Sequence, residues 1–114
     1  MTEKDNEGLN SLILELKKSK KPMWLKVAYE LARPRKKKTE MNLSRLDALI
    51  AEGATVVVPG KILGAGNVSK KFNVAAFGFS NTAKMLIDKA GGKMLSIEDL
   101  FRENPNGSGI VFLK

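Results

Sequence analysis

The sequence predicts an α/β fold for a single domain of 114 residues, and three observations support this prediction. Two uncharged runs, Val56–Val58 and Phe72–Phe79, are bounded by Gly, Pro, Asn and Ser, which is typical of buried strands. Helical and extended patterns then alternate to the end of the sequence, as in parallel sheets with crossover helices. The residues before the first run are helical in pattern and strongly basic. A chain of this length can form one compact domain with a modest core.

Residues 1–8 are polar and contain Gly8, and we expect them to be flexible. Two amphipathic helices should follow, because apolar residues recur at i, i+3, i+4 and i+7. These residues are Leu9, Leu12, Ile13 and Leu16 in the first helix, and Trp24, Val27, Ala28 and Leu31 in the second. Asp5 or Asn6 could cap the first helix. Pro22 suits the first turn of the second, and Pro34 ends it. The spacing favours a core position for Trp24 over stacking on a nucleic-acid base.

A third helix is predicted after the basic segment that follows Pro34. Its apolar positions are Leu43, Leu46, Leu49 and Ile50. Asn42 or Ser44 could cap it, and Gly53 is placed to terminate it. We therefore expect a basic helical part over residues 9–53, joined without a linker to an α/β core over residues 54–114.

Within this core, we expect Pro59-Gly60 to turn the chain after the first strand and Lys61–Leu63 to resume it. Residues 64–67 should form a second turn in which Gly64 and Gly66 adopt positive φ.

The remaining elements have clear start and stop signals. A helix capped by Ser80 or Asn81 should close at Gly91-Gly92, followed by a short strand over residues 93–95. Another helix should start at Ser96 and end in the turn over residues 104–107. The last strand should cover residues 110–113.

Charge is the main functional signal. The chain has a net charge of +8, and residues 17–45 contain eleven Lys or Arg against two acids, Glu30 and Glu40. This segment carries +9, so the rest sums to −1. Such clustering indicates polyanion binding, although a solubilising surface is the alternative. The dense block over residues 33–38 could also be a nuclear-localisation-like tract or a solvated linker. Membrane-surface or calmodulin-type binding is less consistent, because the apolar stripe and the basic block are sequential.

Composition argues against most catalytic chemistry. The chain has neither Cys nor His, so it lacks disulfides, thiolate sites and the commonest general base. Gly64-Ala65-Gly66 leads toward a strand, whereas a dinucleotide fingerprint opens a helix. We expect no enzyme activity, no metal, no cofactor and no small-molecule substrate. With no apolar run near the roughly 20 residues of a membrane span and no secretory signal, we expect no membrane association and a cytoplasmic location.

The order of several short motifs resembles a known family. They are Trp24 through Arg35, Asn42-Leu43-Ser44-Arg45, Val56 through Gly66, Val74-Ala75-Ala76-Phe77, Ser80-x-x-Ala83, Ala90-Gly91-Gly92 and Asn104-Pro105-x-Gly107. The sequence is similar over residues 9–113 to the "eighteen-e" proteins of the archaeal and eukaryotic large ribosomal subunit. Bacterial large-subunit protein "fifteen" shares part of the pattern.

The resemblance implies an irregular ββα-type domain whose N-terminal helices and basic loop lie on large-subunit rRNA, among neighbouring ribosomal proteins. It implies a structural role in translation without catalysis. One departure is Glu40, which places a negative charge beside the expected contact and should point away from phosphate.

The candidate rRNA-binding residues are basic or lie beside the basic segment. They are Lys17, Lys18, Lys20, Lys21, Arg33, Arg35, Lys36, Lys37, Lys38, Asn42, Ser44 and Arg45, with a supplementary group of Lys61, Lys70 and Lys71. For Asn42 and Ser44, helix capping is the alternative role. Three hypotheses remain: a structural rRNA-binding ribosomal protein, a general nucleic-acid-binding architectural protein, and a small enzyme acting on a phosphorylated substrate.

Overall fold

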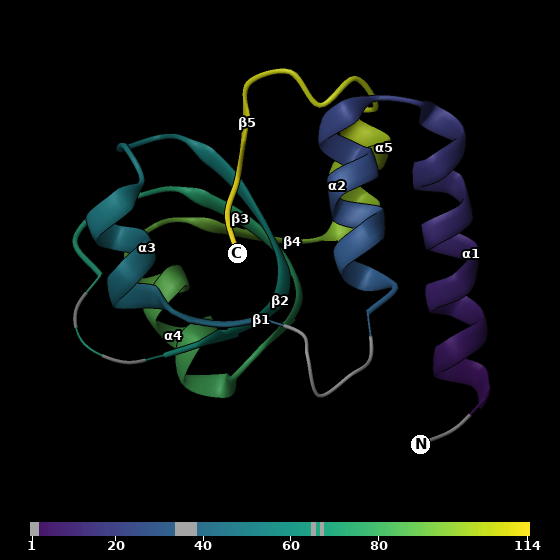
Figure 1. Cartoon of the computed structure of the whole chain (residues 1–114). Coiled ribbons are helices and arrows are strands. Elements are labelled where there is room, and N and C mark those ends of the chain that lie inside the picture. The colour runs from purple at the N-terminus through teal and green to yellow at the C-terminus, as the bar shows by residue number, and fades with distance from the viewer. Residues whose placement is uncertain (1–2, 34–38, 65, 67) are drawn as a thin grey trace.

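Five helices surround one five-stranded parallel sheet in the computed structural model, which describes residues 3–33, 39–64, 66 and 68–114 (Figure 1). The helices are α1 (Glu3–Ser19), α2 (Pro22–Leu31), α3 (Leu43–Leu49), α4 (Asn81–Lys89) and α5 (Ile97–Glu103). The strands are β1 (Thr39–Asn42), β2 (Thr55–Leu63), β3 (Asn73–Phe79), β4 (Lys93–Ser96) and β5 (Ile110–Phe112). The predicted α/β class and its parallel sheet are confirmed.

Strand β2 is the centre of the sheet, whose order is β1-β2-β3-β4 with β5 also paired to β2. One edge of β2 is shared by two strands. β5 pairs with its first residues, Thr55–Val57, and β1 pairs with Gly60–Leu63. The opposite edge pairs with β3. This shared edge makes the sheet irregular, in agreement with the ββα-type fold that the resemblance implied.

Pro59-Gly60 does not turn the chain, so this prediction was wrong. Both residues are buried inside β2, and the register between β2 and β3 shifts between Val58 and Lys61. Proline cannot donate a ladder hydrogen bond, and in sheets it is confined to edges and bulges. The Pro-Gly pair therefore produces an irregularity within β2 and not a turn. It lies where the partner strand along one edge of β2 changes from β5 to β1.

Strand β1 was not predicted. Its sequence, Thr-Glu-Met-Asn, has no apolar run, and it is a strand because it pairs with the second half of β2. The part of the chain that we expected to be only helical and basic therefore also contributes to the sheet.

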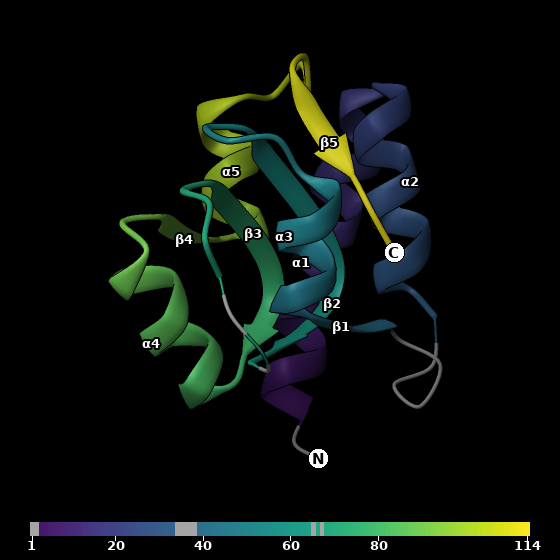
Figure 2. The ribbon, with the colours of Figure 1, turned by 90° about the vertical axis from the view of Figure 1, so that its left-hand side faces the viewer.

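Alternate residues of β2 face two separate cores, so the molecule has three layers (Figure 2). Val56 and Val58 pack with α3 and α4 on one face, where Leu46 and Ile87 are buried. Val57 packs on the opposite face with α1, α2 and α5 in a cluster that includes Leu16, Trp24 and Leu100. Trp24 is fully buried and its Nε1 donates to the Asn104 carbonyl at 3.0 Å, which confirms its core position.

The helix boundaries confirm some caps and correct others. Ser80 and Ser96 cap α4 and α5, each hydroxyl accepting from the backbone N–H three residues later. Helix α1 begins at Glu3, so Asp5 and Asn6 lie inside it and most of the segment expected to be flexible is helical. Helix α3 ends at Leu49, so Gly53 does not terminate it; Gly53 adopts φ +82° in the turn that follows.

Positive φ was predicted for Gly64 and Gly66, but only Gly66 adopts it. Gly64 is instead needed for close packing. A Cβ on Gly64 would lie 2.5 Å from the Ala83 nitrogen and 2.7 Å from the Thr82 carbonyl carbon. Both atoms belong to the first turn of α4, where Ser80 Oγ also accepts from the Gly64 N–H at 3.2 Å. The loop after β2 is therefore packed directly against the start of α4.

We expect Gly64→Ala to destabilise the fold by about 1–3 kcal/mol, because backbone atoms must move to admit the methyl group. Urea unfolding followed by circular dichroism measures the change. Gly78→Ala is the matched control, since no atom lies within 4 Å of a Cβ at that position. Equal unfolding midpoints for the two variants would contradict the packing argument.

Candidate nucleic-acid interface

Four lysines surround the tight turn between α1 and α2. Lys17, Lys18, Lys20 and Lys21, here called the hairpin lysines, are all exposed. Ser19 fixes the turn, because its Oγ donates to the Leu16 carbonyl at 2.6 Å and accepts from the Lys21 N–H at 3.2 Å. Lys20 has φ +58°, a left-handed conformation that is costly for a residue with a Cβ. The turn therefore presents four ammonium groups from a well-defined backbone, with Leu16 and Trp24 buried beneath it.

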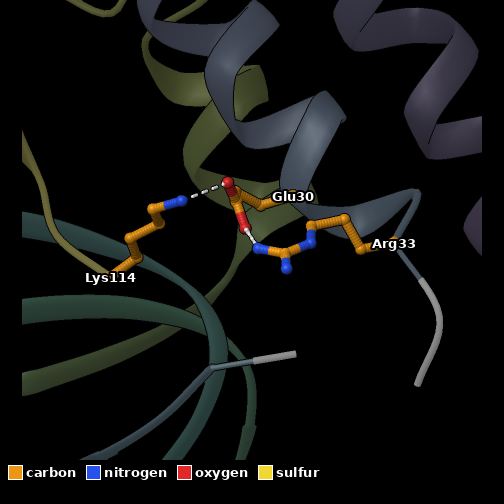
Figure 3. Close-up of polar contacts among 3 residues, drawn as sticks. All are labelled: Glu30, Arg33 and Lys114. Carbon is orange, nitrogen blue, oxygen red and sulfur yellow. Dashed lines mark hydrogen bonds and ion pairs between the residues drawn. The ribbon is translucent and has the colours of Figure 1, made fainter. Parts of the chain in front are cut away.

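At the other end of α2, Arg33 takes part in an ion-pair network around the buried carboxylate of Glu30 (Figure 3). Glu30 is 5% exposed, and its two carboxylate oxygens accept from different cations. Arg33 Nη1 lies 3.1 Å from Oε1, and Lys114 Nζ lies 2.7 Å from Oε2. Arg33 was assigned to phosphate contact, and the structure adds a second role for it, as a partner of Glu30.

Burial alone raises the pKa of Glu30, but the hydrogen bonds and charges of Lys114 and Arg33 outweigh it and hold the pKa below its usual value of 4.5. A carboxylate with a lowered pKa stabilises the folded state above the unfolded-state pKa. That contribution is lost as the pH falls through the folded-state pKa. The network should therefore weaken below about pH 4.5.

We expect Glu30→Gln to destabilise the protein by about 1–3 kcal/mol at pH 7, because two cations lose a charged acceptor. It should also flatten the loss of stability that sets in as the pH falls below the usual glutamate pKa of 4.5, as measured by urea unfolding at decreasing pH. The control is Glu98→Gln, which removes a half-exposed carboxylate paired to Arg102 at 2.9 Å and should cost less than about 0.5 kcal/mol. A Glu30→Gln variant with the parental acid profile would show that the network contributes little.

The hairpin lysines and Arg33 lie at opposite ends of α2, although they belong to one basic run in the sequence. Figure 1 shows the α1–α2 turn at one end of the helix pair and the end of α2 at the other. The ten residues of α2 span about 15 Å. The basic segment therefore contributes to at least two separate surfaces of the molecule. Arg35, Lys36, Lys37 and Lys38 lie outside the described residues.

The start of α3 presents Asn42, Ser44 and Arg45, which are all exposed. Asn42 occupies the N-cap position, but its side chain makes no capping hydrogen bond to the described backbone. Ser44 lies within the helix, close to Gly66 of the loop after β2. Asn42 therefore occupies the predicted cap position without a side-chain hydrogen bond, Ser44 does not cap the helix, and both polar groups remain exposed beside Arg45.

The supplementary lysines do not form one cluster with a shared role. Lys70 Nζ donates to the Ile50 carbonyl at 3.0 Å, so this amine holds the loop before β3 against α3. Lys71 is exposed and adjacent to it. Lys61 is exposed on β2 at the position paired with Glu40 of β1, so the acid that departs from the family pattern lies next to a candidate cation.

Asp47 fixes the same loop from α3. Its carboxylate accepts from the Lys70 N–H at 2.9 Å and from the Ser69 N–H and hydroxyl. The Lys70 N–H, the largest influence, and the Ser69 donors hold the pKa of Asp47 below its ordinary value, while partial burial opposes them. Asp47 is thus a structural acid that orders the surface around Lys71.

Lys26 and Lys114 are basic side chains that the sequence analysis did not assign to a site. Lys26 lies on the outer side of α2, with its Nζ 6.0 Å from the centroid of the Phe112 ring. Lys114 reaches Glu30 across 84 residues of sequence. The helical period could have placed Lys26 opposite the apolar stripe, but no local signal connects Lys114 to α2.

The described residues were compared with three kinds of functional feature: a dinucleotide-binding loop, a metal cluster and a membrane-spanning helix. Gly64 and Gly66 precede strand β3, unlike the strand–loop–helix order of a dinucleotide-binding motif. In the ranges that the structure describes, no three acidic, His or Cys side chains gather as a metal site. Of the helices within those ranges, none is long and apolar enough to cross a membrane.

The fold and the exposed cations define a small, basic α/β protein with cationic surfaces on its helical side. Residues 12–114 match the family described as "Ribosomal protein 60S L18 and 50S L18e", and the chain belongs to this family. It is 44% identical over 110 residues to a Methanococcus maripaludis protein named "Large ribosomal subunit protein eL18", covering 96% of this chain and 92% of the relative. A Methanopyrus kandleri protein of the same name is 45% identical over 118 residues, covering 96% and 93%. The resemblance seen in the sequence is therefore confirmed.

Proposed function

We propose that this protein is a structural constituent of the large ribosomal subunit that binds and stabilises large-subunit rRNA. The observation that carries the proposal is the near full-length similarity to archaeal proteins named as large-subunit components. The strongly basic sequence and its exposed hairpin lysines support the same function. In this role the protein acts in the cytoplasm, on ribosomes, beside other large-subunit proteins and without catalysing a reaction.

Binding through phosphate contacts follows from the chemistry of these side chains and of RNA. Double-stranded RNA has a deep, narrow major groove that side chains cannot read, so it is recognised by shape, phosphates and 2′-hydroxyls. The exposed lysines act as point charges, and Arg33 and Arg45 can form bidentate contacts with phosphate. The candidate residues remain those assigned from the sequence, although the Lys70 amine also donates to the Ile50 carbonyl.

Two ends of a rigid helix pair can contact two different RNA segments. The hairpin lysines lie beyond one end of α2, and Arg33, followed in the sequence by Arg35–Lys38, lies at the other. The protein would then act as a brace that fixes the distance between rRNA elements. Such a role suits a three-layer domain in which both sheet faces are packed.

Sucrose-gradient sedimentation of lysate from cells that express the tagged protein tests the proposal. The protein should sediment with large subunits and move to the top of the gradient after ribonuclease treatment. In a matched-salt competition, a large-subunit rRNA fragment should displace labelled rRNA better than duplex DNA of the same length. Migration free of large subunits, together with equal competition by DNA, would favour a general architectural nucleic-acid-binding protein instead.

A further inference from the structure

A groove between α2 and β5 combines an apolar wall with positive charge. It is lined by Leu25, Lys26, Tyr29, Glu30, Phe112 and Lys114, and its volume is about 460 Å³. We call it the α2–β5 groove. Pockets that bind small organic groups have volumes of about 300–1,000 Å³ and apolar walls with a few polar groups. The groove is open to solvent, so a planar ring could lie against its apolar wall with its attached groups in water.

The charge of the groove favours an anionic ligand. Both oxygens of Glu30, the acid that lines it, already accept from Lys114 and Arg33. Lys26 adds a third cation, 6.0 Å from the centroid of the Phe112 ring. The side chains of Lys26, Lys114 and Arg33 together with that of Glu30 carry a summed charge of +2.

Tyr29, the more exposed of the two aromatic side chains that line the groove, is available for stacking. Tyr29 is 67% exposed and Leu25 is 39% exposed, although both lie on the helix that buries Trp24. Bases in single-stranded RNA segments are commonly recognised by stacking on aromatic side chains, with basic residues contacting the backbone. An exposed Tyr in a groove that is also lined by two lysines matches that pattern.

We propose that the α2–β5 groove binds one unpaired nucleotide of RNA, with its base against the Tyr29 ring and its phosphate near Lys26 and Lys114. This inference rests on the proposed rRNA binding, and it specifies that this surface binds an unpaired nucleotide of the RNA. RNA is favoured over an acidic protein segment because Arg33, at the edge of the groove, leads directly into the basic residues 35–38.

Fluorine NMR gives a direct test, because the chain contains a single Tyr. Incorporation of 3-fluorotyrosine produces one resonance, which reports on Tyr29 alone. The probes are a mixed-sequence 12-nucleotide single-stranded RNA and a blunt 12-base-pair RNA duplex. Fluorescence anisotropy measures how much of the protein each RNA has saturated. The resonance should shift as the single strand binds and stay in place as the duplex binds.

Variants separate stacking from general charge. Tyr29→Ala should weaken single-strand binding roughly 5- to 100-fold and leave duplex binding unchanged, whereas Tyr29→Phe should retain most of the affinity. Leu14→Ala is the control, because it truncates a 57% exposed side chain on α1, away from the groove. Loss of affinity in Leu14→Ala equal to that in Tyr29→Ala would overturn the inference.

The outcomes distinguish this inference from the proposed function. RNA that saturates the protein while the Tyr29 resonance stays fixed overturns the groove assignment and leaves rRNA binding intact. If the Tyr29 resonance does not shift with RNA but shifts with an acidic, Phe-containing hexapeptide, the groove binds a protein partner instead of RNA. Failure of both RNAs to bind at low salt overturns the groove assignment and the proposed function together.

Discussion

Val57→Asp should leave the protein largely unfolded at 25 °C. Val57 is fully buried in β2, between Ala75 of β3 and Phe112 of β5, and it packs in the core that contains Trp24 and Leu100. An ionised carboxylate there costs several kcal/mol, and a neutral one still leaves polar groups without partners. This penalty, added to the lost packing of Val57, is comparable to the 5–15 kcal/mol by which domains of this kind are stable.

Trp24 provides the measurement for Val57→Asp, since it is the single Trp of the chain and is fully buried. Its fluorescence should shift to the red in the variant, and far-UV circular dichroism should show no cooperative thermal transition. Val111→Asp places the same side chain on neighbouring β5, where the residue is 39% exposed, and should remain folded. A folded Val57→Asp variant with parental Trp emission would mean that this face of the sheet is not the tightly packed core described above.

Replacement of all four hairpin lysines with Gln should weaken rRNA binding about a thousandfold at 0.1 M salt. Each phosphate that a lysine neutralises contributes about 0.7–0.9 to the magnitude of the salt slope. Four contacts therefore contribute about 3 to the magnitude of the slope of log Kobs against log[salt]. When salt is lowered from 1 M to 0.1 M, these contacts raise the binding constant by about three orders of magnitude, and the variant lacks that gain. Stability should change little, because all four side chains are exposed.

The control for the hairpin lysines removes the same charge from another surface. Lys84, Lys89, Lys93 and Arg102 are exposed on α4, β4 and α5, and their replacement with Gln also lowers the net charge by four. Anisotropy titrations of an rRNA fragment at several salt concentrations should show a much smaller change of slope for this variant. Equal losses in the two variants would mean that net charge, and not the α1–α2 turn, determines binding.

Local patterns in the sequence predicted most elements because local physics determines them. The i, i+3, i+4, i+7 spacing around Trp24 identified α2, and Pro22 is its first residue. Ser80 and Ser96 were identifiable as caps because a Ser hydroxyl can satisfy an N–H group of the first helical turn, and both do so. The uncharged runs became β2 and β3 because both of their faces are covered.

Elements without such local patterns were not predictable in the same way. Strand β1 exists through its pairing with Gly60–Leu63, and nothing in its own four residues indicates a strand. Pro59-Gly60 has the composition of a turn but lies within a strand, because β2 changes partners along one edge at that point. Gly64 has its role only because α4 begins next to it.

The candidate interface likewise has features that the sequence determines and features that depend on tertiary structure. The sequence alone determined the excess of positive charge, the absence of His and Cys, and the residues that resemble the family. It could not show that the hairpin lysines and Arg33 lie at opposite ends of a helix, or that Lys70 is anchored to Ile50. Nor could it show that Glu30 is buried between Arg33 and a lysine 84 residues away. Charge and helical period follow from neighbours along the chain. The position of a charge on the surface depends on how distant segments pack, so only the tertiary structure decided where these charges lie.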